Sequence, residues 1–522
     1  MTAARRPGLP RLTFPQLWVA LAILLPILAA LLATLSTVDL AYNIRAGDLI
    51  LDQGAVLRTD PFAFTTAGGP WLDQQWGAQV LLALADRAGG WAGLAILRAL
   101  LVGLVIGLVY VACRRSGVGQ RVGAWLALAA FVLAAAAMGM RPQLLGMVLF
   151  AATLAILAGR SGRTGRVRWA VWLIPLLVIP WASIHGSFIF APVAVGVAWL
   201  EDLLAGRPAA RTMLAVAITT ALASLVNPFG IGVWSYAIGL TTNPTIRRLI
   251  SEWQPTAPLS ASGLLLYGSM IIFGLLILRR LRADAAAGSR RGLWRQVGPA
   301  ILWLAFLGIV AASAERGIAW WALAAPVAVA GLLGRPRAVE ASGAAEAPRA
   351  MEPPGEGAAG RAPAPVERVE RASGLNGAIV VVLALVGVVL LPVWRGGTAL
   401  EGPPGLLTDA PAGITTALLA RAGPADRVWN AQRWGSWLEL ALPGVPIAVD
   451  SRIEVIPTAA WDDHIALSDG AADWQAILDR WQVTVVVASR EEQAALIPLI
   501  QASSAWTQVY QDADGLVFIR AR

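Results

Sequence analysis

The chain has 522 residues, of which 57% are hydrophobic and only 14% are charged, and its mean hydropathy is +0.64. Soluble domains of this length do not reach such values, so the composition indicates a membrane protein. The net charge is +9, the pI is about 10.8, and every basic residue is arginine. Most of these arginines lie in short loops between apolar runs, where membrane topology explains them better than nucleic-acid binding does.

The N-terminal end of the chain indicates an uncleaved membrane helix. Three arginines within residues 5–11 precede the apolar run 17–35, which is about long enough to span a bilayer and is followed by many further spans. Cys113 is the only cysteine. The chain therefore forms neither an internal disulfide nor a CxxC metal or redox site.

Eleven apolar runs are long enough, or nearly long enough, to cross a membrane as helices. They lie at about 17–35, 90–112, 120–138, 142–158, 169–183, 187–204, 211–226, 261–279, 296–313, 317–333 and 375–394. With a cytoplasmic N-terminus, the even-numbered crossings return the chain to its arginine-rich loops, as the positive-inside rule requires. The segments richest in other polar residues then open outside the cytoplasm, and they are 37–76, 139–143, 184–186, 227–260 and 314–316. We expect a multipass membrane protein with an extracytoplasmic site.

Composition divides the chain into four parts. They are a membrane domain with a large first outer loop (1–334), a linker (335–374), a last transmembrane helix (375–395) and a C-terminal domain (396–522). The linker has almost no large apolar side chain, so it cannot bury enough surface to fold, and we expect a disordered cytoplasmic segment. The C-terminal domain carries a net charge of −7, whereas the remaining residues carry +16. This difference indicates a separate extracytoplasmic domain.

The C-terminal domain alternates between strand and helix patterns. These predict strands at 445–450, 483–488 and 515–520 and helices at 411–422, 471–481 and 490–502. Ser489 and Glu492 form a capping-box pattern before the last of these helices. The predicted fold class is mostly α, a polytopic transmembrane helix bundle with a small C-terminal extracytoplasmic α/β domain. No Gly-rich phosphate loop follows the predicted strands, so nucleotide binding is not indicated.

The stretch VDLAYNIRAGD, residues 38–48, follows the first span directly. An apolar stripe with helical spacing and a terminating glycine predict a helix that lies on the membrane surface, and its residues are Leu40, Ile44, Gly47, Leu51 and Gly54. Asp39 lies beside this stripe, where it is either a functional carboxylate or only an N-cap. Arg45 and Asp48 lie on the other side, where an exposed pair at i,i+3 spacing is the simplest interpretation.

Further polar residues stand where the outer loops meet the spans, and they are Asp60, Asp73, Arg141, His185, Glu252 and Arg316. Asp60 suits a turn and Asp73 suits a helix cap. A lone histidine such as His185 is more often a packing residue than a metal ligand. An arginine at the outer interface needs an anionic partner, either the phosphate of a bound lipid or ordinary headgroups, and Arg98 lies inside a span.

Two further stretches have simple structural interpretations. NPFG at 227–230 predicts a turn, and Glu252 stands beside Trp253, which suits an interfacial aromatic anchor. Asp450, Ser451 and Arg452 end a predicted strand. Open α/β sheets usually bind ligands at such positions, and a strand-end salt bridge is the alternative.

Six stretches, taken in order, resemble a family of bacterial multipass proteins within the GT-C glycosyltransferase superfamily, which includes mannosyltransferases and aminoarabinose transferases. They are DLAYNIRAGDLILDQGAVLRTDPFAFTTAGGPWLDQQW, RPQLLGMVLF, WASIHGSFIF, LVNPFGIGVWSY with ISEWQP, ERGIAWWALAAP and RVWNAQRWGSWLELALPGVPIAVDSRIEV. The resemblance implies transfer of a sugar from a polyprenyl-phosphate carrier to an acceptor outside the membrane. It also implies an acidic catalytic residue in the first outer loop.

By this resemblance Asp39 would be the general base, and a single base implies inversion at the anomeric carbon. Arg316 or Arg141 would hold the departing lipid phosphate. The remaining substrate- or lipid-phosphate-binding candidates are Arg45, Asp48, His185 and Glu252.

The sequence does not decide whether the site binds a divalent metal. Relatives often have Trp and His where this chain has Ala41, Tyr42 and Asn43, so no metal is required. A divalent metal is nevertheless possible, because Asp39, Asp48 and His185 could form a site if the loop folds over the span ends.

The expected partners are a polyprenyl-phosphate-linked sugar, the lipid bilayer and a cell-envelope glycan, lipid or protein acceptor, with no nucleic acid. The alternative is a non-catalytic protein that binds or transports a polyprenyl lipid or a cell-envelope polymer. A transporter would have ionisable residues deep in several spans, but Arg98 is essentially the only deep charge. No HExxH or GxSxG pattern indicates an intramembrane protease.

Overall fold

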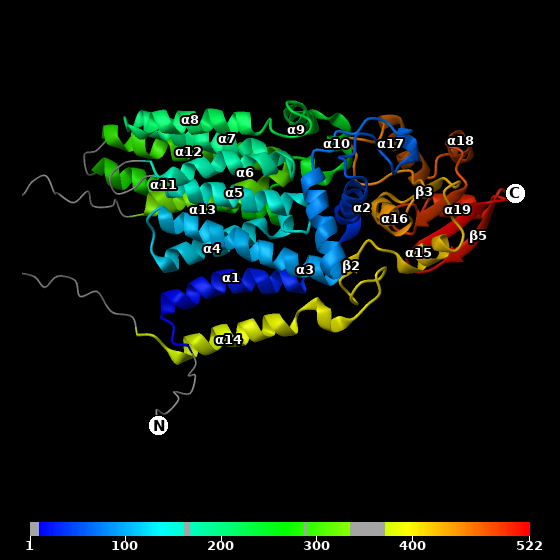
Figure 1. Cartoon of the computed structure of the whole chain (residues 1–522), viewed down its shortest axis with the longest axis horizontal. Helices are drawn as coiled ribbons and strands as arrows, with labels where there is room; N and C mark the ends of the chain where they lie inside the picture. The colour runs from blue at the N-terminus through cyan, green and yellow to red at the C-terminus, as the bar shows by residue number, and fades with distance from the viewer. Residues whose placement is uncertain (1–9, 161–166, 287–289, 335–370, 522) are drawn as a thin grey trace, which may run out of the picture.

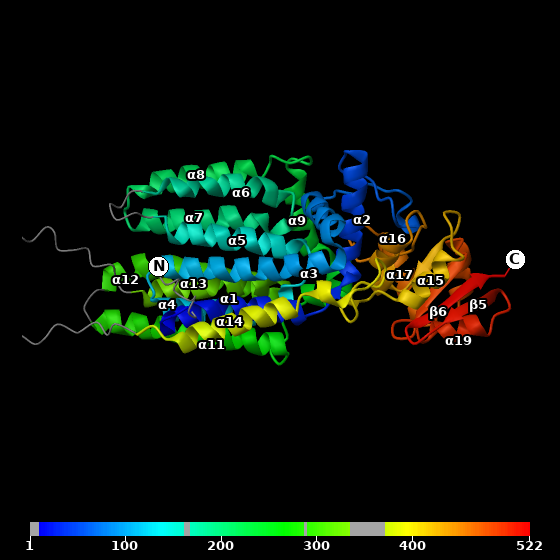
Figure 2. The same cartoon turned by 60° about the horizontal axis from the view of Figure 1, so that its bottom comes forward.

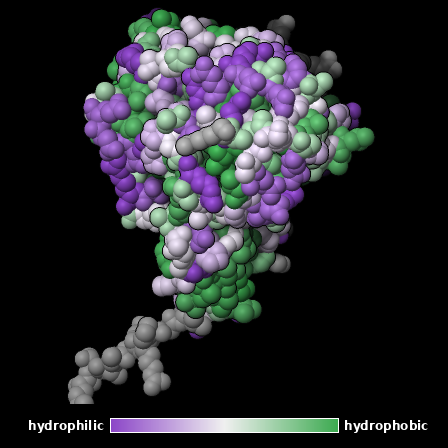
Figure 3. All heavy atoms as spheres, turned by 90° about the vertical axis from the view of Figure 1, so that its right-hand side faces the viewer, coloured by the Kyte–Doolittle hydropathy of each residue, from purple (hydrophilic) through white to green (hydrophobic). Residues whose placement is uncertain are grey.

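The computed structural model describes residues 10–160, 167–286, 290–334 and 371–521. Residues 335–370 of the predicted linker lie outside this part. A bundle of long helices forms one end of the molecule, and the C-terminal domain sits on the other end, as Figures 1 and 2 show. Figure 3 looks onto the C-terminal domain, whose face is largely hydrophilic, while hydrophobic surface lies below it.

The bundle helices coincide with the eleven apolar runs predicted from the sequence. They are α1 (Phe14–Leu32), α3 (Trp76–Arg115), α4 (Gln120–Ala134), α5 (Pro142–Ala158), α6 (Leu173–Ala182), α7 (Phe190–Leu204), α8 (Ala209–Ala223), α11 (Ala261–Ala286), α12 (Arg290–Ser313), α13 (Ile318–Leu333) and α14 (Gly374–Val389). Among the described residues, six helical segments are long and apolar enough to cross a membrane, and five further apolar helices are shorter. The chain is a multipass membrane protein.

Helix α3 changes direction at Gly90, whose φ of 55° and ψ of −154° break the helical backbone. A side chain at this position would be strained, so glycine is required here. The first half of α3 runs across the end of the bundle beside α2 (Thr37–Gln53), and its second half enters the bundle (Figure 1). The two helices approach closely at Gly47, where an added Cβ would stand 2.1 Å from the carbonyl oxygen of Gln79.

Helix α2 ends at Gly54 in the left-handed conformation, with φ of 66°, so its predicted end is confirmed. Asp39 is not the N-cap of this helix, so that alternative is wrong. The N-cap is Ser36, whose hydroxyl accepts the hydrogen bond from the backbone N–H of Val38, and Asp39 lies in the first turn. The helix is also covered on more than the one predicted stripe. The first half of α3 covers one side and α16 (Gln432–Ala441) of the C-terminal domain covers another, so Tyr42 and Asn43 are buried as well.

The C-terminal domain contains a four-stranded mixed sheet in the order β3 (Val428–Asn430), β4 (Val485–Ser489), β6 (Gly515–Arg520) and β5 (Trp506–Gln511). β3 and β4 are parallel, whereas β6 is antiparallel to both of its neighbours. The predicted strands at 483–488 and 515–520 are confirmed. The remaining helices of this domain are α15 (Ala412–Leu419), α17 (Thr458–Ser468), α18 (Trp474–Arg480) and α19 (Leu496–Gln501).

The predicted strand at 445–450 is wrong, because only Ile447 in this segment forms isolated β-bridges. A side-chain amide takes the place of a neighbouring strand. Asn430 Oδ1 accepts from the backbone N–H groups of Ala448 and Val449, and its Nδ2 donates to the Val449 carbonyl at 2.8 Å. The predicted capping box closes only a turn, since Ser489 Oγ accepts from the N–H groups of Glu491 and Glu492 but α19 begins at Leu496.

Two contacts join the first span to later parts of the chain. β1 (Leu35–Ser36) pairs in parallel with β2 (Leu407–Thr408), which lies between the last span and the C-terminal sheet. Arg98 donates to the carbonyl groups at the end of α1, including those of Ala30 and Ala33 at 2.6 Å each. The C-terminal end of α1 therefore supplies acceptors for this intramembrane arginine.

Candidate functional site

A cavity of about 550 Å³ lies where the bundle meets the C-terminal domain. Residues from all five predicted outer segments line it. The five predicted site residues that reach it are Asp39, Arg141, His185, Glu252 and Arg316. The C-terminal domain contributes Gln432, Ser451, Arg452 and Glu454. The cavity volume falls in the range of small-molecule sites.

Arg141, the residue before α5, joins two carboxylates in this cavity. Its Nη2 lies 3.0 Å from Glu252 Oε1, and its Nη1 lies 3.4 Å from Asp39 Oδ2. Glu252 belongs to the short 3-10 helix η5 (Ser251–Trp253), and its second oxygen lies 4.0 Å from Arg316 Nη1. Arg316 also stacks over the ring of Trp253 at 5.4 Å. The cluster contains two cations and two anions.

The charges in this cluster are strongly coupled. Burial opposes ionisation of Glu252, but the guanidinium groups of Arg141 and Arg316 outweigh it and hold the pKa of this carboxyl below its usual value. The N-terminus of α5 also faces the cavity, since Arg141, Pro142 and Gln143 line it. The positive end of a helix dipole therefore adds to the two guanidinium groups, and the three together favour an anionic ligand.

His185 lines the cavity in its neutral form. It precedes the 3-10 helix η4 (Gly186–Ile189), and its Nδ1 accepts from the Ser187 N–H at 3.1 Å and contacts Ser187 Oγ at 2.8 Å. Burial lowers the pKa of His185 well below its usual value, and the charges of Arg316 and Arg141 lower it further. The proton of the ring is thus left on Nε2, which makes His185 a capping residue with one remaining donor.

Two buried amides in the cavity wall have unused hydrogen-bonding atoms. Asn43 donates to the backbone carbonyl of Asp39 at 2.6 Å, and its Oδ1 has no partner within the described part of the chain. Gln143 is only 1% exposed, and neither its Oε1 nor its Nε2 has a partner among the described residues. Buried polar groups are normally satisfied, so these two amides are exceptions among the described residues of the cavity wall.

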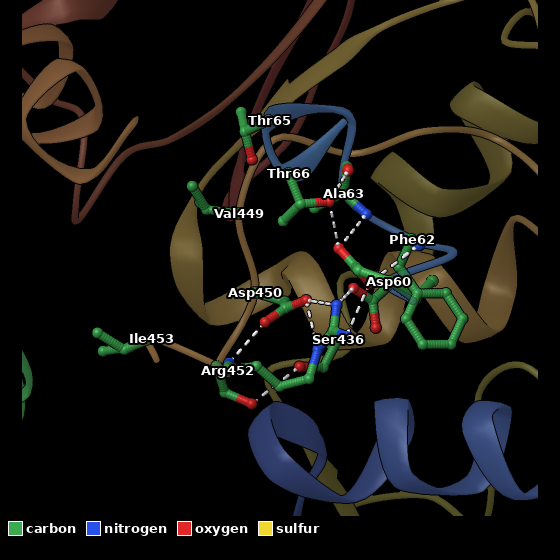
Figure 4. Close-up of polar contacts among 12 residues, drawn as sticks. Asp60, Phe62, Ala63, Thr65, Thr66, Ser436, Val449, Asp450, Arg452 and Ile453 are labelled. Carbon is green, nitrogen blue, oxygen red and sulfur yellow. Dashed lines mark hydrogen bonds and ion pairs between the residues drawn. The ribbon is translucent and has the colours of Figure 1, made fainter. Parts of the chain in front are cut away.

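Arg452 connects the C-terminal domain to the first outer loop (Figure 4). Its guanidinium lies 2.8 Å from Asp60 and 3.4 Å from Glu439, and its Nε donates to Asp450 at 2.9 Å. The side chains of all four residues are at most 1% exposed. Three rings surround the same guanidinium, and they are those of Trp71, Phe62 and Tyr42, at 4.6, 4.9 and 5.6 Å.

The cluster of Arg452, Asp60, Asp450 and Glu439 shows the roles of Asp60 and Asp450, for which the sequence left alternatives open. Asp60 does close a turn, because it accepts from the N–H groups of Phe62 and Ala63, but it also forms the buried ion pair across the junction. Asp450 and Arg452 form the salt bridge that was the alternative to a ligand site, although no strand precedes them. Arg452 holds the pKa of Asp450 below its usual value despite burial.

Two predicted site residues do not reach the cavity. Asp48 pairs at 2.7 Å with Arg87 on the first half of α3, so the predicted pair of Arg45 with Asp48 is wrong. Neither Arg45 nor Asp48 is among the lining residues. Across residues 10–160, 167–286, 290–334 and 371–521, no group of three or more His, Cys, Asp or Glu is placed to hold a metal ion.

One polar pair in the cavity was not predicted from the sequence. Tyr236 on α9 (Gly232–Thr242) donates its hydroxyl to Glu454 at 2.7 Å. Burial raises the pKa of Glu454. The sequence contains one indication that Glu454 belongs to the site. This residue lies two positions after Arg452, in a stretch that carries the family resemblance.

The bundle and the C-terminal domain together have the fold of several solved glycosyltransferases, although the sequence identities are low. The oligosaccharyltransferase AglB of Archaeoglobus fulgidus, in complex with an inhibitory peptide and a dolichol-phosphate, is 12% identical, with a TM-score of 0.55 over 98% of this chain and 75% of AglB. ArnT of Cupriavidus metallidurans bound to undecaprenyl phosphate is 15% identical, with a TM-score of 0.50 over 96% of this chain and 97% of ArnT.

The mycobacterial arabinofuranosyltransferase AftD has the same fold, with 17% identity and a TM-score of 0.53 over 99% of this chain. This chain spans only 41% of AftD. Neither a protein-family model nor a curated protein matches the sequence. The resemblance predicted from the sequence is confirmed at the level of the fold.

Proposed function

We propose that the chain is an inverting glycosyltransferase that transfers a sugar from a polyprenyl-phosphate carrier to an acceptor hydroxyl outside the cytoplasm. The observation that carries this proposal is the sharing of Arg141 by Asp39 and Glu252 beside Arg316. It puts a carboxylate that can take a proton within one cavity with guanidinium groups that can hold a phosphate. AglB with dolichol-phosphate and ArnT with undecaprenyl phosphate support a carrier of this class.

In the proposed reaction, Asp39 removes the proton of the acceptor hydroxyl while that oxygen attacks the anomeric carbon of the donor sugar. The bond between the anomeric carbon and the phosphate oxygen breaks, and polyprenyl phosphate leaves with the electron pair. The side chain of Asp39 is 39% exposed, which leaves the carboxylate accessible to an acceptor that enters the cavity.

The arginines stabilise the negative charge that develops on the phosphate during this step. Asp39 loses its negative charge as it gains the proton, and the departing phosphate gains one. Arg141 lies 3.4 Å from Asp39 before the reaction, so protonation of Asp39 leaves this guanidinium with one anionic partner fewer, Glu252 being the one that remains. Arg316 and the N-terminus of α5 supply further stabilisation of the leaving group.

The proposal is tested by transfer assays on purified protein in lipid, with radiolabelled polyprenyl-phosphate sugars. Asp39→Asn removes the base, and we expect turnover to fall by about 10²–10⁴-fold while binding of polyprenyl phosphate persists. Asp48→Asn is the matched control, since Asp48 lies on the same helix but pairs with Arg87 outside the cavity. Turnover by Asp39→Asn within a few fold of the wild-type rate would refute the role of this residue.

The same assay separates the transferase from a non-catalytic binding protein. A binding protein would retain polyprenyl phosphate in the cavity but would not turn over any donor and acceptor pair. A parallel reaction with EDTA measures metal dependence.

A further inference from the structure

We propose that Asp409 is a positioning residue for Asp39, because it fixes the start of the helix that carries the proposed base. This inference rests on the proposed transferase function, since it concerns how the base of that reaction is held. Asp409 follows β2, between the last span and the C-terminal sheet, and its side chain is only 11% exposed. Ser36 and Asp39 line the cavity, whereas Asp409 is not among the lining residues.

The backbone of Asp409 has an unusual conformation. Its φ is 63°, in the left-handed region that glycine adopts most readily and that aspartate tolerates better than most residues do. A side chain in this region costs free energy that the surrounding structure must supply, and such residues cluster at functional sites. The chain thus has a side chain where the backbone alone would favour glycine, which points to a role for the carboxylate.

The carboxylate and the carbonyl group of Asp409 both contact the start of α2. Its Oδ2 accepts the hydroxyl of Ser36 at 3.0 Å, and its backbone oxygen accepts the hydroxyl of Thr37 at 2.9 Å. Ser36 is the N-cap of α2 and Thr37 is its first residue. The parallel pairing of Ser36 with Thr408 holds the same junction. One short segment therefore fixes the start of α2 through a side chain, a carbonyl group and strand pairing.

The other carboxylate oxygen of Asp409 connects this junction to the C-terminal domain. Oδ1 lies 3.0 Å from Nη2 of Arg433 and accepts from its Nε at 3.1 Å. Arg433 belongs to α16, the helix that packs against α2. Asp409 therefore joins α16 to the N-cap of α2, and Asp39 lies in the first turn after that N-cap.

The position of this first turn decides where the carboxylate of Asp39 lies. A general base has to be within hydrogen-bond reach of the proton that it removes, and a misplacement of about 1 Å can cost about 10²-fold in rate. Arg141 and Arg316, which are proposed to hold the carrier phosphate, lie on other segments, before α5 and in the 3-10 helix Glu315–Gly317. Loss of the Asp409 side chain should therefore lower turnover and leave carrier binding nearly unchanged.

The experiment measures kcat and the donor KM with radiolabelled polyprenyl-phosphate sugars, and binding of bare undecaprenyl phosphate, on the full-length protein in lipid. Asp409→Gly removes the side chain and suits the left-handed backbone, so its melting temperature should match the wild type. We expect its kcat to fall by about 10–100-fold, with donor KM and carrier binding within a few fold of the wild type. Gln482→Gly is the matched control, because Gln482 also has a positive φ, of 54°, at an exposed position, and its kcat should be unchanged.

Two further variants separate positioning from general damage. Asp409→Asn keeps a group that can bond to the Ser36 hydroxyl, so its kcat should stay within a few fold of the wild type. Ser36→Ala removes that hydroxyl and should lower kcat as Asp409→Gly does. Because the two residues act through one contact, the double variant should be no slower than the slower single variant.

The contrary results are equally defined. The inference is overturned if Asp409→Gly turns over as fast as Gln482→Gly, if Asp409→Asn loses as much as Asp409→Gly, or if the losses of the two single variants multiply. A rise in donor KM at unchanged kcat would also overturn it. If Asp39→Asn is inactive while Asp409→Gly is fully active, the inference alone fails. If the wild type does not turn over, or Asp39→Asn does, the proposed function fails and the inference fails with it.

Discussion

Replacing Arg452 with methionine should weaken the junction between the C-terminal domain and the first outer loop. The arginine and its partners Asp60 and Asp450 are almost completely buried. Removal of one partner from a buried ion pair typically costs about 3–5 kcal/mol, because the charges left behind are uncompensated. Burial raises the pKa of Glu439 well above its usual value, which disfavours a negative charge on this residue.

The free energy of unfolding should therefore fall by about 4 kcal/mol in Arg452→Met. This is a large fraction of the roughly 5–15 kcal/mol that stabilises an ordinary domain. Thermal unfolding in detergent, followed by tryptophan fluorescence, measures it, and limited proteolysis reports whether the C-terminal domain detaches. Arg433→Met is the matched control, since Arg433 is 32% exposed and its pair with Asp409 should contribute less than about 1 kcal/mol.

A second variant distinguishes loss of the cation from general damage to the core. Methionine at 452 combined with Asp60→Asn and Asp450→Asn removes the uncompensated charges as well, and it should recover much of the lost stability. If Arg452→Met unfolded at the wild-type temperature, or no more easily than Arg433→Met, the buried cluster would not hold the junction.

Three other outcomes are expected. Gly47→Ala would put a Cβ 2.1 Å from the Gln79 carbonyl oxygen, so α2 and α3 must separate, and both the melting temperature and turnover should fall. Burial raises the pKa of Asp73 from 3.8 to about 7, so the native state binds an extra proton between these pH values and wild-type stability falls as pH rises through them. Asp73→Asn should lack this fall, which is on the order of 4 kcal/mol. Trp253→Ala removes the ring under Arg316, and carrier binding should weaken by a few fold.

Each of these outcomes has a control or a contrary result. Gly107→Ala, which adds a Cβ into open space in α3, should leave the melting temperature unchanged. Parallel stability curves for the wild type and Asp73→Asn between pH 4 and 8 would contradict the shifted ionisation. Trp169→Ala is the control for Trp253→Ala, because Trp169 is 75% exposed. If both variants weakened carrier binding equally, Trp253 would have no specific role in it.

The hydrophobic pattern predicted the bundle well, because apolar runs of span length have few other structures available. The end of α2 at Gly54 and the strands β4 and β6 were also predictable from local pattern. The segment 445–450 was not, since Ile447 forms only isolated bridges and the side chain of Asn430 binds the backbone groups of Ala448 and Val449. A side chain that binds the backbone of another segment leaves no periodic pattern in the sequence, so it cannot be predicted from hydrophobic periodicity.

Positions of polar residues at span ends predicted which side chains could reach the cavity, but not their partners. Asp48 had the same local appearance as Asp39, and only the turn of α3 at Gly90 brings Arg87 to it. The sequence predicted an anionic partner for Arg98, whereas its guanidinium donates to backbone carbonyls at the end of α1. Such pairings depend on helix directions, which are not encoded in a local pattern.

Asp60 and Arg452 are separated by 392 residues, and this distance along the chain has a consequence for biosynthesis. The aspartate is made soon after the first span, but its cation is made only after every bundle helix has been synthesised. Until then the nascent protein lacks the wall of the cavity that the C-terminal domain supplies. A chain that terminates before Arg452 therefore leaves the carboxylate of Asp60 without its buried cation.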